Sequence, residues 1–342
     1  MKYSEYMEEV IEKIKQEFPN MTFYENEPMS KHCSMKVGGP VRAIAVPSDI
    51  FSLSKITFIL QDNYIAPFIL GNGTNILIPD EGLNIFVIST EKLQKMWLAD
   101  ESKIYVDAGV SLSKVSQFAA NNSLSGLEFA SGIPGTVGGA VLMNAGAYGS
   151  EMKDIVESVV YYDLHDQALN EVLGSECDFS YRHSRFENES RIILGAMLSL
   201  EKSEKESVVA KMNELNEKRR TSQPLDKPSC GSAFKRPEKG YAAALIEESG
   251  LKGFSIGDAQ VSDKHAGFIV NNGNATYDEL YELISHVRNT VLEKSNIALE
   301  PEIKIYPKNM VLIDTYQEEA AAKAIRDNKE QIARQLAETG EE

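Results

Sequence analysis

The sequence has few cysteines, and their arrangement excludes several classes of protein. Three occur in 342 residues, at Cys33, Cys177 and Cys230, widely separated and without a C-x-x-C pair. An odd, scattered set does not fit the paired framework of a disulfide-rich secreted domain, and the spacing matches no zinc site. We therefore expect a protein of the reducing cytoplasm that holds no metal.

Excess positive charge and long apolar segments are also missing. Lys and Arg number 35 against 51 Asp and Glu, a net charge of −16, whereas nucleic-acid binding requires clustered positive charge. No segment approaches the roughly 20 apolar residues of a membrane span. The first residues also lack the apolar run of a signal peptide. We expect a soluble protein with no nucleic-acid partner and no membrane span.

The length exceeds that of a usual single domain, so we expect more than one folded unit. The hydrophobic periodicity predicts an α/β (α+β) protein of three domains, because helical and strand-like segments alternate in the first and third parts and strands dominate the second. The predicted boundaries are 1–90, 91–203 and 204–306, followed by a charged, alanine-rich helical tail over 307–342. The tail lacks an apolar stripe, which indicates a solvated appendage or a contact with a partner or a second copy.

Apolar spacing and capping residues place the main elements. Helices are predicted over 5–17, 50–62, 111–121, 203–220, 240–249 and 277–295, and strands over 41–46, 67–70, 76–78, 104–108, 155–163, 191–200, 265–270 and 303–307. Ser48 and Asp49 are expected to cap the second of these helices.

The most informative segment is Ser131-Gly-Ile-Pro-Gly-Thr-Val-Gly-Gly-Ala-Val-Leu-Met-Asn-Ala-Gly146. It contains five glycines and one proline in sixteen positions. Backbone with so little side-chain volume can lie directly against a ligand, and its N–H groups can converge on an anion. The alternative is an ordinary glycine-rich turn.

A second small-residue segment, Gly71-Asn-Gly-Thr-Asn75, lies between the apolar runs 67–70 and 76–78. Two such loops, each after a strand, suggest a diphosphate held from both sides. Neither contains the G-x-G-x-x-G of a dinucleotide fold or the G-K-[ST] of a P-loop. The pattern predicts a nucleotide site outside the two common folds.

The two loops resemble the FAD-binding part of the UDP-N-acetylenolpyruvoylglucosamine reductase family, which acts in peptidoglycan synthesis. Three later segments strengthen the resemblance: Tyr181-Arg-His-Ser-Arg185, Pro228-Ser-Cys-Gly-Ser-Ala-Phe-Lys-Arg-Pro237 and Leu299-Glu-Pro-Glu-Ile-Lys304. The resemblance extends from about Ser30 to Tyr306. The two loops alone would also fit other flavoproteins of the vanillyl-alcohol-oxidase type.

The resemblance implies a three-domain flavoprotein with a vanillyl-alcohol-oxidase-type FAD-binding region and a C-terminal substrate domain. It implies bound FAD, NADPH as co-substrate, and reduction of the UDP-sugar UDP-N-acetylglucosamine enolpyruvate to UDP-N-acetylmuramate. The residues expected to bind FAD are Gly71, Asn72, Gly73, Thr74, Asn75, Ser131, Gly132, Ile133, Pro134, Gly135, Thr136, Gly138, Gly139, Asn144 and Gly146.

The same resemblance gives three catalytic residues. Arg182 corresponds to the arginine that pairs with the substrate carboxylate, Ser232 to the donor of a proton to substrate C2, and Glu302 to the catalytic glutamate. Glu300 is a rival for the last role. Taken alone, the three would be a surface cation, a turn serine and an edge-strand carboxylate.

Arg220 and Lys264 are expected substrate contacts. Gln223 stands where some relatives have a lysine, which leaves that contact open. The short connection after residue 200 also lacks the tyrosine-bearing loop of some members, so the chain resembles the loopless subclass.

Two other functions remain open from the sequence. One is a flavin oxidase or dehydrogenase of the same fold that acts on another sugar or alcohol, which would be distinguished by its dependence on NADPH and by peroxide production. The other is a non-catalytic nucleotide-sugar binder, which would be colourless after purification.

Overall fold

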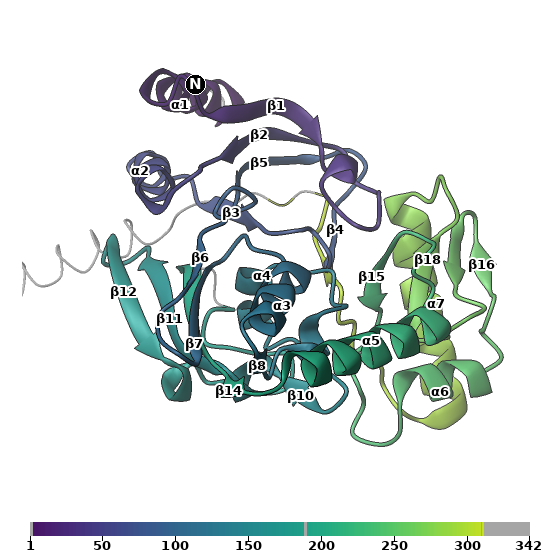
Figure 1. Cartoon of the computed structure of the whole chain (residues 1–342). Helices are drawn as coiled ribbons and strands as arrows, with labels where there is room; N and C mark the ends of the chain where they lie inside the picture. The colour runs from purple at the N-terminus through teal and green to yellow at the C-terminus, as the bar shows by residue number, and fades with distance from the viewer. Residues whose placement is uncertain (1–2, 188–189, 309, 311–342) are drawn as a thin grey trace, which may run out of the picture.

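The computed structural model describes residues 3–187, 190–308 and 310. Three sheets with their helices surround a central region that contains α3 (Leu112–Asn121) and α4 (Val137–Leu142). The N-terminal sheet lies above this region in Figure 1, the five-stranded sheet to its left and the third sheet to its right. Of the tail predicted over 307–342, residues 309 and 311–342 lie outside the described residues.

The first sheet has the order β1-β2-β5-β3. Its elements are α1 (Tyr3–Glu17), β1 (Thr22–Pro28), β2 (Pro40–Val46), α2 (Ile50–Gln61), β3 (Pro67–Leu70), β4 (Ile76–Leu77) and β5 (Leu83–Ser89). The amphipathic spacing predicted for α1 is confirmed, because Met7, Val10, Ile11 and Ile14 are buried against α2 and the sheet. Asp49 caps α2 by accepting the N–H of Ser52 at 2.8 Å.

The second sheet is antiparallel, with the order β12-β11-β13-β7-β6. Its part of the chain contains β6 (Met96–Leu98), β7 (Lys103–Asp107), α3, β8 (Leu124–Ser125), α4, β9 (Gly146–Ala147), β10 (Ser150–Glu151), β11 (Val156–Asp163), β12 (Ala168–Leu173), β13 (Arg191–Ser199) and β14 (Glu201–Lys202). Its inner face and the two helices form one hydrophobic cluster around Val106, Val137 and Ala196. This packing fixes α4, which lies within the long glycine-rich segment 131–146.

The third sheet, of order β15-β18-β17-β16, is also antiparallel. The elements are α5 (Lys205–Ser222), β15 (Ser229–Ser232), α6 (Ala242–Glu248), β16 (Ser255–Ile256), β17 (Ala259–Val261), β18 (Phe268–Asn271), α7 (Tyr277–Ser295) and β19 (Lys304–Ile305). Four short 3-10 helices complete the described chain: Met29–Lys31, Glu128–Ala130, Met152–Asp154 and Gly174–Glu176.

Contacts between distant segments hold the three parts together. The last strand, β19, pairs in parallel with β4, so Lys304 lies opposite Ile76. The cluster of the third sheet includes Met35 and Leu77 from the first part of the chain. The hydrophobic clusters therefore cross the boundaries predicted from the sequence.

The predicted elements correspond closely to the observed ones, with local shifts. The strand expected over 265–270 begins only at Phe268, because residues 265–267 form a turn in which the N–H of Phe268 donates to His265 O. Throughout the described ranges, we find no helix with the length and apolar character needed to cross a membrane.

Candidate active site

A cavity of about 430 Å³ lies between the two glycine-rich loops. One loop follows β3, and the other precedes and begins α4. The Asn72 side-chain amide donates to Pro134 O at 3.1 Å, so the loops contact each other directly. The predicted FAD-binding residues that line the cavity are Gly71, Asn72, Gly73, Thr74, Asn75, Ile133, Pro134, Gly135, Thr136, Gly138, Gly139 and Gly146.

The glycines of these loops differ in what surrounds them. A Cβ added to Gly135 would meet no atom closer than 4.0 Å, and one added to Gly139 would meet only the Thr136 hydroxyl at 3.6 Å. By contrast, a Cβ on Gly138 would lie 2.8 Å from the Ala108 Cβ, and one on Gly73 would lie 2.2 Å from His32 O. Gly135 and Gly139 therefore leave space in the cavity, which fits a ligand lying directly against the backbone.

The Thr136 hydroxyl caps α4 by accepting the N–H of Gly139 at 3.4 Å. On the other loop, the Asn75 side-chain amide donates to Glu302 O at 3.0 Å. Asn75 O in turn accepts the N–H of Lys304 at 3.0 Å. The loop 71–75, which is the first glycine-rich loop along the chain, is thus bonded both to the second glycine-rich loop, 131–146, and to the segment that contains Glu302.

Arg182, Ser232 and Glu302 all line this cavity. They come from a turn in the second part of the chain, from β15, and from the segment before β19. The Arg182 Nε donates to Glu302 Oε1 at 2.6 Å, and both side chains are mostly buried. The structure therefore brings the three predicted catalytic residues to one site.

Opposing effects act on the pKa of the Glu302 carboxyl. Burial raises its pKa above the ordinary value, while the Arg182 charge and hydrogen bond lower it, with a smaller contribution from Lys235. Its backbone is fixed as well, because the N–H of Glu302 donates to Ala233 O at 2.9 Å, next to Ser232. A carboxyl held this way stays close to both Arg182 and Ser232.

Ser232 ends β15, where it pairs with Phe268 of β18. The preceding Gly231 has a φ of +75° and has nothing within 4 Å of an added Cβ. A positive φ is a conformation that glycine adopts without strain. The turn therefore presents the Ser232 hydroxyl at the cavity wall.

Arg220 and Lys264 lie elsewhere. The Arg220 side chain is 74% exposed and pairs with Glu217, and Lys264 Nζ donates to Arg220 O at 2.6 Å. Neither residue lines the cavity; the neighbouring Arg219 does. Burial lowers the pKa of Arg219, and its guanidinium lies 5.8 Å from the Tyr148 ring centre.

The remaining predicted residues, Ser131, Gly132 and Asn144, support the site from outside the cavity lining. The Ser131 hydroxyl contacts Asn216 Oδ1 at 3.3 Å. A Cβ on Gly132 would lie 2.4 Å from the same oxygen and 3.1 Å from Arg219 Nε. This part of the loop therefore packs against α5 and positions Arg219.

Sequence reasoning did not select several charged residues of the cavity. Arg191 pairs with Asp163 at 3.2 Å, and Lys304 lies 4.0 Å from Glu187. One sequence signal was present for Lys304, since it belongs to the same segment, 299–304, as the predicted catalytic residue Glu302. Across the described ranges, no cluster of His, Cys, Asp and Glu could hold a metal ion.

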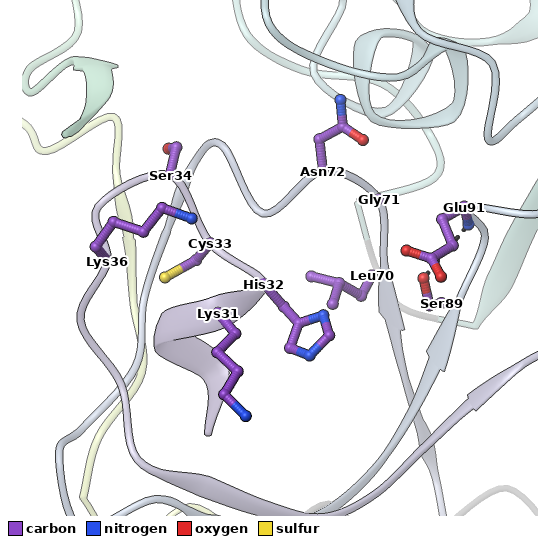
Figure 2. A pocket seen from close by; sticks show the side chains of 10 residues that line it. All are labelled: Lys31, His32, Cys33, Ser34, Lys36, Leu70, Gly71, Asn72, Ser89 and Glu91. Carbon is purple, nitrogen blue, oxygen red and sulfur yellow. Dashed lines mark hydrogen bonds between the residues drawn. The ribbon is translucent and has the colours of Figure 1, made fainter. Parts of the chain in front are cut away.

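A second, smaller cavity of about 250 Å³ shares Leu70, Gly71 and Asn72 with the first. Figure 2 shows Lys31, His32 and Lys36 on one side of it and Ser89 and Glu91 on the other. His32 Nε2 lies 3.1 Å from Glu27 Oε1, so a carboxylate faces the imidazole at this edge of the cavity. The turn at Gly71 and Asn72 therefore has a cavity on either side.

The fold and the main cavity define the class of protein. A mixed α/β framework with two facing glycine-rich loops, an open space along their backbone and a mostly buried Arg182–Glu302 pair beside it fits a flavin-dependent oxidoreductase. Residues 41–169 match the family model of an FAD-binding domain. The residues present therefore fit FAD.

The particular family follows from the remaining similarity. Residues 223–306 match the model of the C-terminal domain of UDP-N-acetylenolpyruvoylglucosamine reductase. The reductase of Caldanaerobacter subterraneus is 46% identical over 296 residues, covering 86% of this chain and 97% of the relative. The Thermotoga maritima reductase is 46% identical over 282 residues, covering 82% and 97%. The chain belongs to the UDP-N-acetylenolpyruvoylglucosamine reductase family.

A solved structure agrees with this assignment. The crystal structure of the reductase from Thermus caldophilus aligns with a TM-score of 0.72 and 34% identity, covering 84% of this chain and 99% of the other. In the present structure, β13 and α5 are separated only by residues 200–204. That connection is too short to carry an inserted loop.

Proposed function

We propose that this protein reduces UDP-N-acetylglucosamine enolpyruvate to UDP-N-acetylmuramate with electrons from NADPH. The observation that carries the proposal is the convergence of Arg182, Ser232 and Glu302 on a cavity whose other walls are the two glycine-rich loops. When bound, FAD would supply hydride transfer between NADPH and the enolpyruvyl group. The product is a precursor of peptidoglycan, which links the activity to cell growth and division.

Both loops would hold the cofactor through backbone groups. Gly135 and Gly139 leave room for close approach, while Asn72 and Asn75 hold the first loop in place. Exposed backbone N–H groups in such turns favour anions, which suits a diphosphate.

Arg182 would bind the substrate carboxylate. Its bond to Glu302 uses Nε, and a guanidinium has five N–H donors in a planar fork. The terminal nitrogens could therefore grip a carboxylate in the bidentate manner that suits arginine. The Arg182 charge would stabilise the negative charge that develops on this carboxylate during hydride addition. Glu302 would do so in its protonated form, as a hydrogen-bond donor, and burial favours that form because it raises the Glu302 pKa.

Ser232 would donate the proton that completes the reaction at C2. An alcohol is a weak acid, so it can protonate only a strongly basic carbon, which hydride addition to the adjacent carbon would generate. The position of Ser232 near the Arg182–Glu302 pair supports this role, since the pair would fix the carboxylate next to C2.

Arg219 is the better candidate for the anionic part of the UDP-sugar than Arg220. Its guanidinium lies at the cavity and is largely desolvated, whereas the Arg220 side chain points into solvent. The three-domain division at 90, 203 and 306, the use of NADPH and the cytoplasmic location are also parts of this proposal. The unpaired cysteines support the location.

The test separates the two halves of the reaction. Ser232→Ala is expected to retain FAD and its reduction by NADPH, because neither step uses the hydroxyl. Reoxidation by the enolpyruvyl substrate should fall by about 10²- to 10⁴-fold, the usual contribution of a positioned acid. Anaerobic stopped-flow absorbance measures both rates.

Ser232→Cys serves as the matched variant, because a thiol of similar reach is a stronger acid and should restore part of the rate. Equal slowing of both half-reactions in Ser232→Ala would show that the serine only shapes the turn. Purified wild-type protein that is colourless, or that forms peroxide instead of reducing the enolpyruvyl substrate, would contradict the proposed function.

A further inference from the structure

Asn144 lies just beyond the C-terminal end of α4 and has no exposed surface. Its backbone adopts φ = +42°, a conformation uncommon for residues other than glycine. The side-chain amide donates to Glu151 Oε2 and to Ser180 O, both at 2.9 Å, and its oxygen accepts the N–H of Lys153 at 2.9 Å. Both polar atoms of its side chain are therefore bonded to residues that do not line the cavity.

Ser180 begins the turn that carries Arg182. Ser180 and His183 exchange two backbone hydrogen bonds of 3.1 and 3.2 Å, so Tyr181 and Arg182 are the central residues of a tight turn. Just after the turn, the Ser184 hydroxyl donates to Leu142 O at 2.8 Å. Both ends of the turn are thus bonded to the C-terminal end of α4.

The N-terminal end of α4 lines the large cavity through Thr136, Gly138 and Gly139, and Leu142 and Met143 at its C-terminal end line the cavity as well. The helix has six residues, and at 1.5 Å per residue it spans about 9 Å. One short, packed element therefore joins the second glycine-rich loop to the turn of Arg182. Arg182 itself has φ = +56°, and a non-glycine residue in that region persists only where its surroundings hold it.

We propose that Asn144 is a positioning residue that fixes the Arg182 turn at a set distance from the second glycine-rich loop. The importance of this for turnover rests on the proposed function of Arg182. The amide suits this position chemically, because Ser180 O and the Glu151 carboxylate are both acceptors and the Asn144 amide donates to each. A carboxylate at position 144 would repel both.

Loosening Arg182 has a consequence for Glu302. Burial raises the pKa of Glu302, and the facing charges of Arg182 and Lys235 oppose that shift. Lys235 also pairs with Glu300, and Lys304 on the same segment lies near Glu187. If Arg182 moves away, the Glu302 pKa rises further. Any part of the pH–rate profile that is controlled by the ionisation of this carboxyl, here called its pH limb, then moves to higher pH.

Asn144→Ala tests the proposal, with Asn271→Ala as its matched control. Asn271 is also a buried asparagine, whose amide donates to Met35 O and whose oxygen accepts from the N–H groups of Gly273 and Ala275. Both variants should unfold at lower temperature, retain FAD and be reduced by NADPH at the wild-type rate. Only Asn144→Ala should slow reoxidation by the enolpyruvyl substrate, by up to about 100-fold, and shift its pH limb upward.

A wild-type pH profile in Asn144→Ala, or an equal shift in Asn271→Ala, would overturn the proposal. If Asn144→Ala fails to fold, Ser184→Ala removes the second tie and should shift the profile in the same direction by less. Coupling between Asn144 and Arg182 can be measured without turnover, from the pH dependence of the unfolding temperature. Asn144→Ala should change this dependence in the wild-type protein but should not change it in a protein that already carries Arg182→Met. Failure of turnover with this coupling intact would contradict the proposed function alone.

Discussion

At the scale of single residues, the glycines of the two loops have different roles. Gly73 has φ = +59° and lies against backbone, and Gly138 lies against Ala108, so both are required by the protein's own packing. Gly135 and Gly139 have open space beside them and no positive φ. The sequence pattern marks all of them equally, and only the structure separates packing from ligand space.

This difference predicts contrasting results for two neighbouring glycines. Gly139→Val should fold with an unfolding temperature close to that of wild type, because its Cβ enters empty space, but it should retain little FAD. Gly138→Val should be destabilised whether or not FAD is present, because the side chain would overlap Ala108. Flavin absorbance and thermal unfolding of the two purified variants provide the measurement. A fully yellow Gly139→Val protein would contradict the placement of the cofactor.

The Arg182–Glu302 pair predicts a pH-dependent stability. Because the folded pKa of Glu302 is raised, its contribution to stability is fully present below the ordinary carboxyl pKa and is lost as pH rises through the folded value. Arg182→Met removes the charge that opposes this pKa shift, so the loss of stability with rising pH should be larger in the variant. The destabilisation of Arg182→Met should be small near pH 5 and approach about 3 kcal/mol at pH 8, as for a buried pair missing one partner.

Thermal unfolding across that pH range, without added substrate, provides the measurement. The double variant Arg182→Met/Glu302→Gln is the control, since it has no ionisable group at position 302 and should lose the pH dependence. A destabilisation by Arg182→Met that is equal at both pH values would show that Glu302 does not titrate with this pair.

At the scale of elements, helices with clear start signals could be predicted well from the sequence. Asp49, Ser111 and Thr276 each accept a backbone N–H of the first helical turn as N-caps. These are local signals, which is why the predicted starts of α2, α3 and α7 agree with the structure. The position of Ser232 near Arg182 and Glu302 came instead from family resemblance, because no local pattern connects three segments so far apart.

The register of α5, meaning which of its faces turns toward the cavity, could not be predicted from local signals. Its 18 residues are mostly polar, with only Val208, Met212 and Leu215 buried. A helix that is polar on most sides does not reveal from sequence which face turns inward. Choosing between Arg219 and Arg220 therefore required the packing of Asn216 against Ser131, which places Arg219 on the cavity side.

This register predicts a difference between two adjacent arginines. Arg219→Gln should raise the KM for the enolpyruvyl substrate by about tenfold or more, because an anion contact in a desolvated site is lost. Arg220→Gln should change KM little, because its charge is exposed and already paired with Glu217. Steady-state kinetics of both variants at fixed NADPH test this. The opposite ranking would show that the helix turns its other face to the substrate.

At the scale of the whole molecule, the end of the family match lies next to a contact with two other parts of the chain. The match to the C-terminal domain model stops at residue 306. Just beyond it, Lys308 bonds to both Glu81 and Asp278 at 2.9 Å and attaches this end to the first and third parts of the chain. Among the described residues that line the cavity, Tyr306 is the last along the chain.

Truncation after Met310 should therefore leave FAD content and turnover close to wild type. The cut retains the Lys308 ion pairs and the packing of Met310 against the first sheet. Turnover and size-exclusion chromatography of the truncated protein, compared with the full chain, provide the measurement. Loss of activity in a truncated protein that still folds would indicate that the tail acts on the site or builds an active oligomer.

The pairing of β19 with β4 also has a consequence during synthesis on the ribosome. Asn75 and Glu302, which bond across this junction, are 227 positions apart. At about 5–20 residues per second, the first glycine-rich loop would emerge roughly 10–45 s before its partner segment. Throughout that interval the nascent chain lacks the strand that fixes this loop and the carboxylate of the site. Cofactor capture should therefore be one of the last events in the biogenesis of the enzyme.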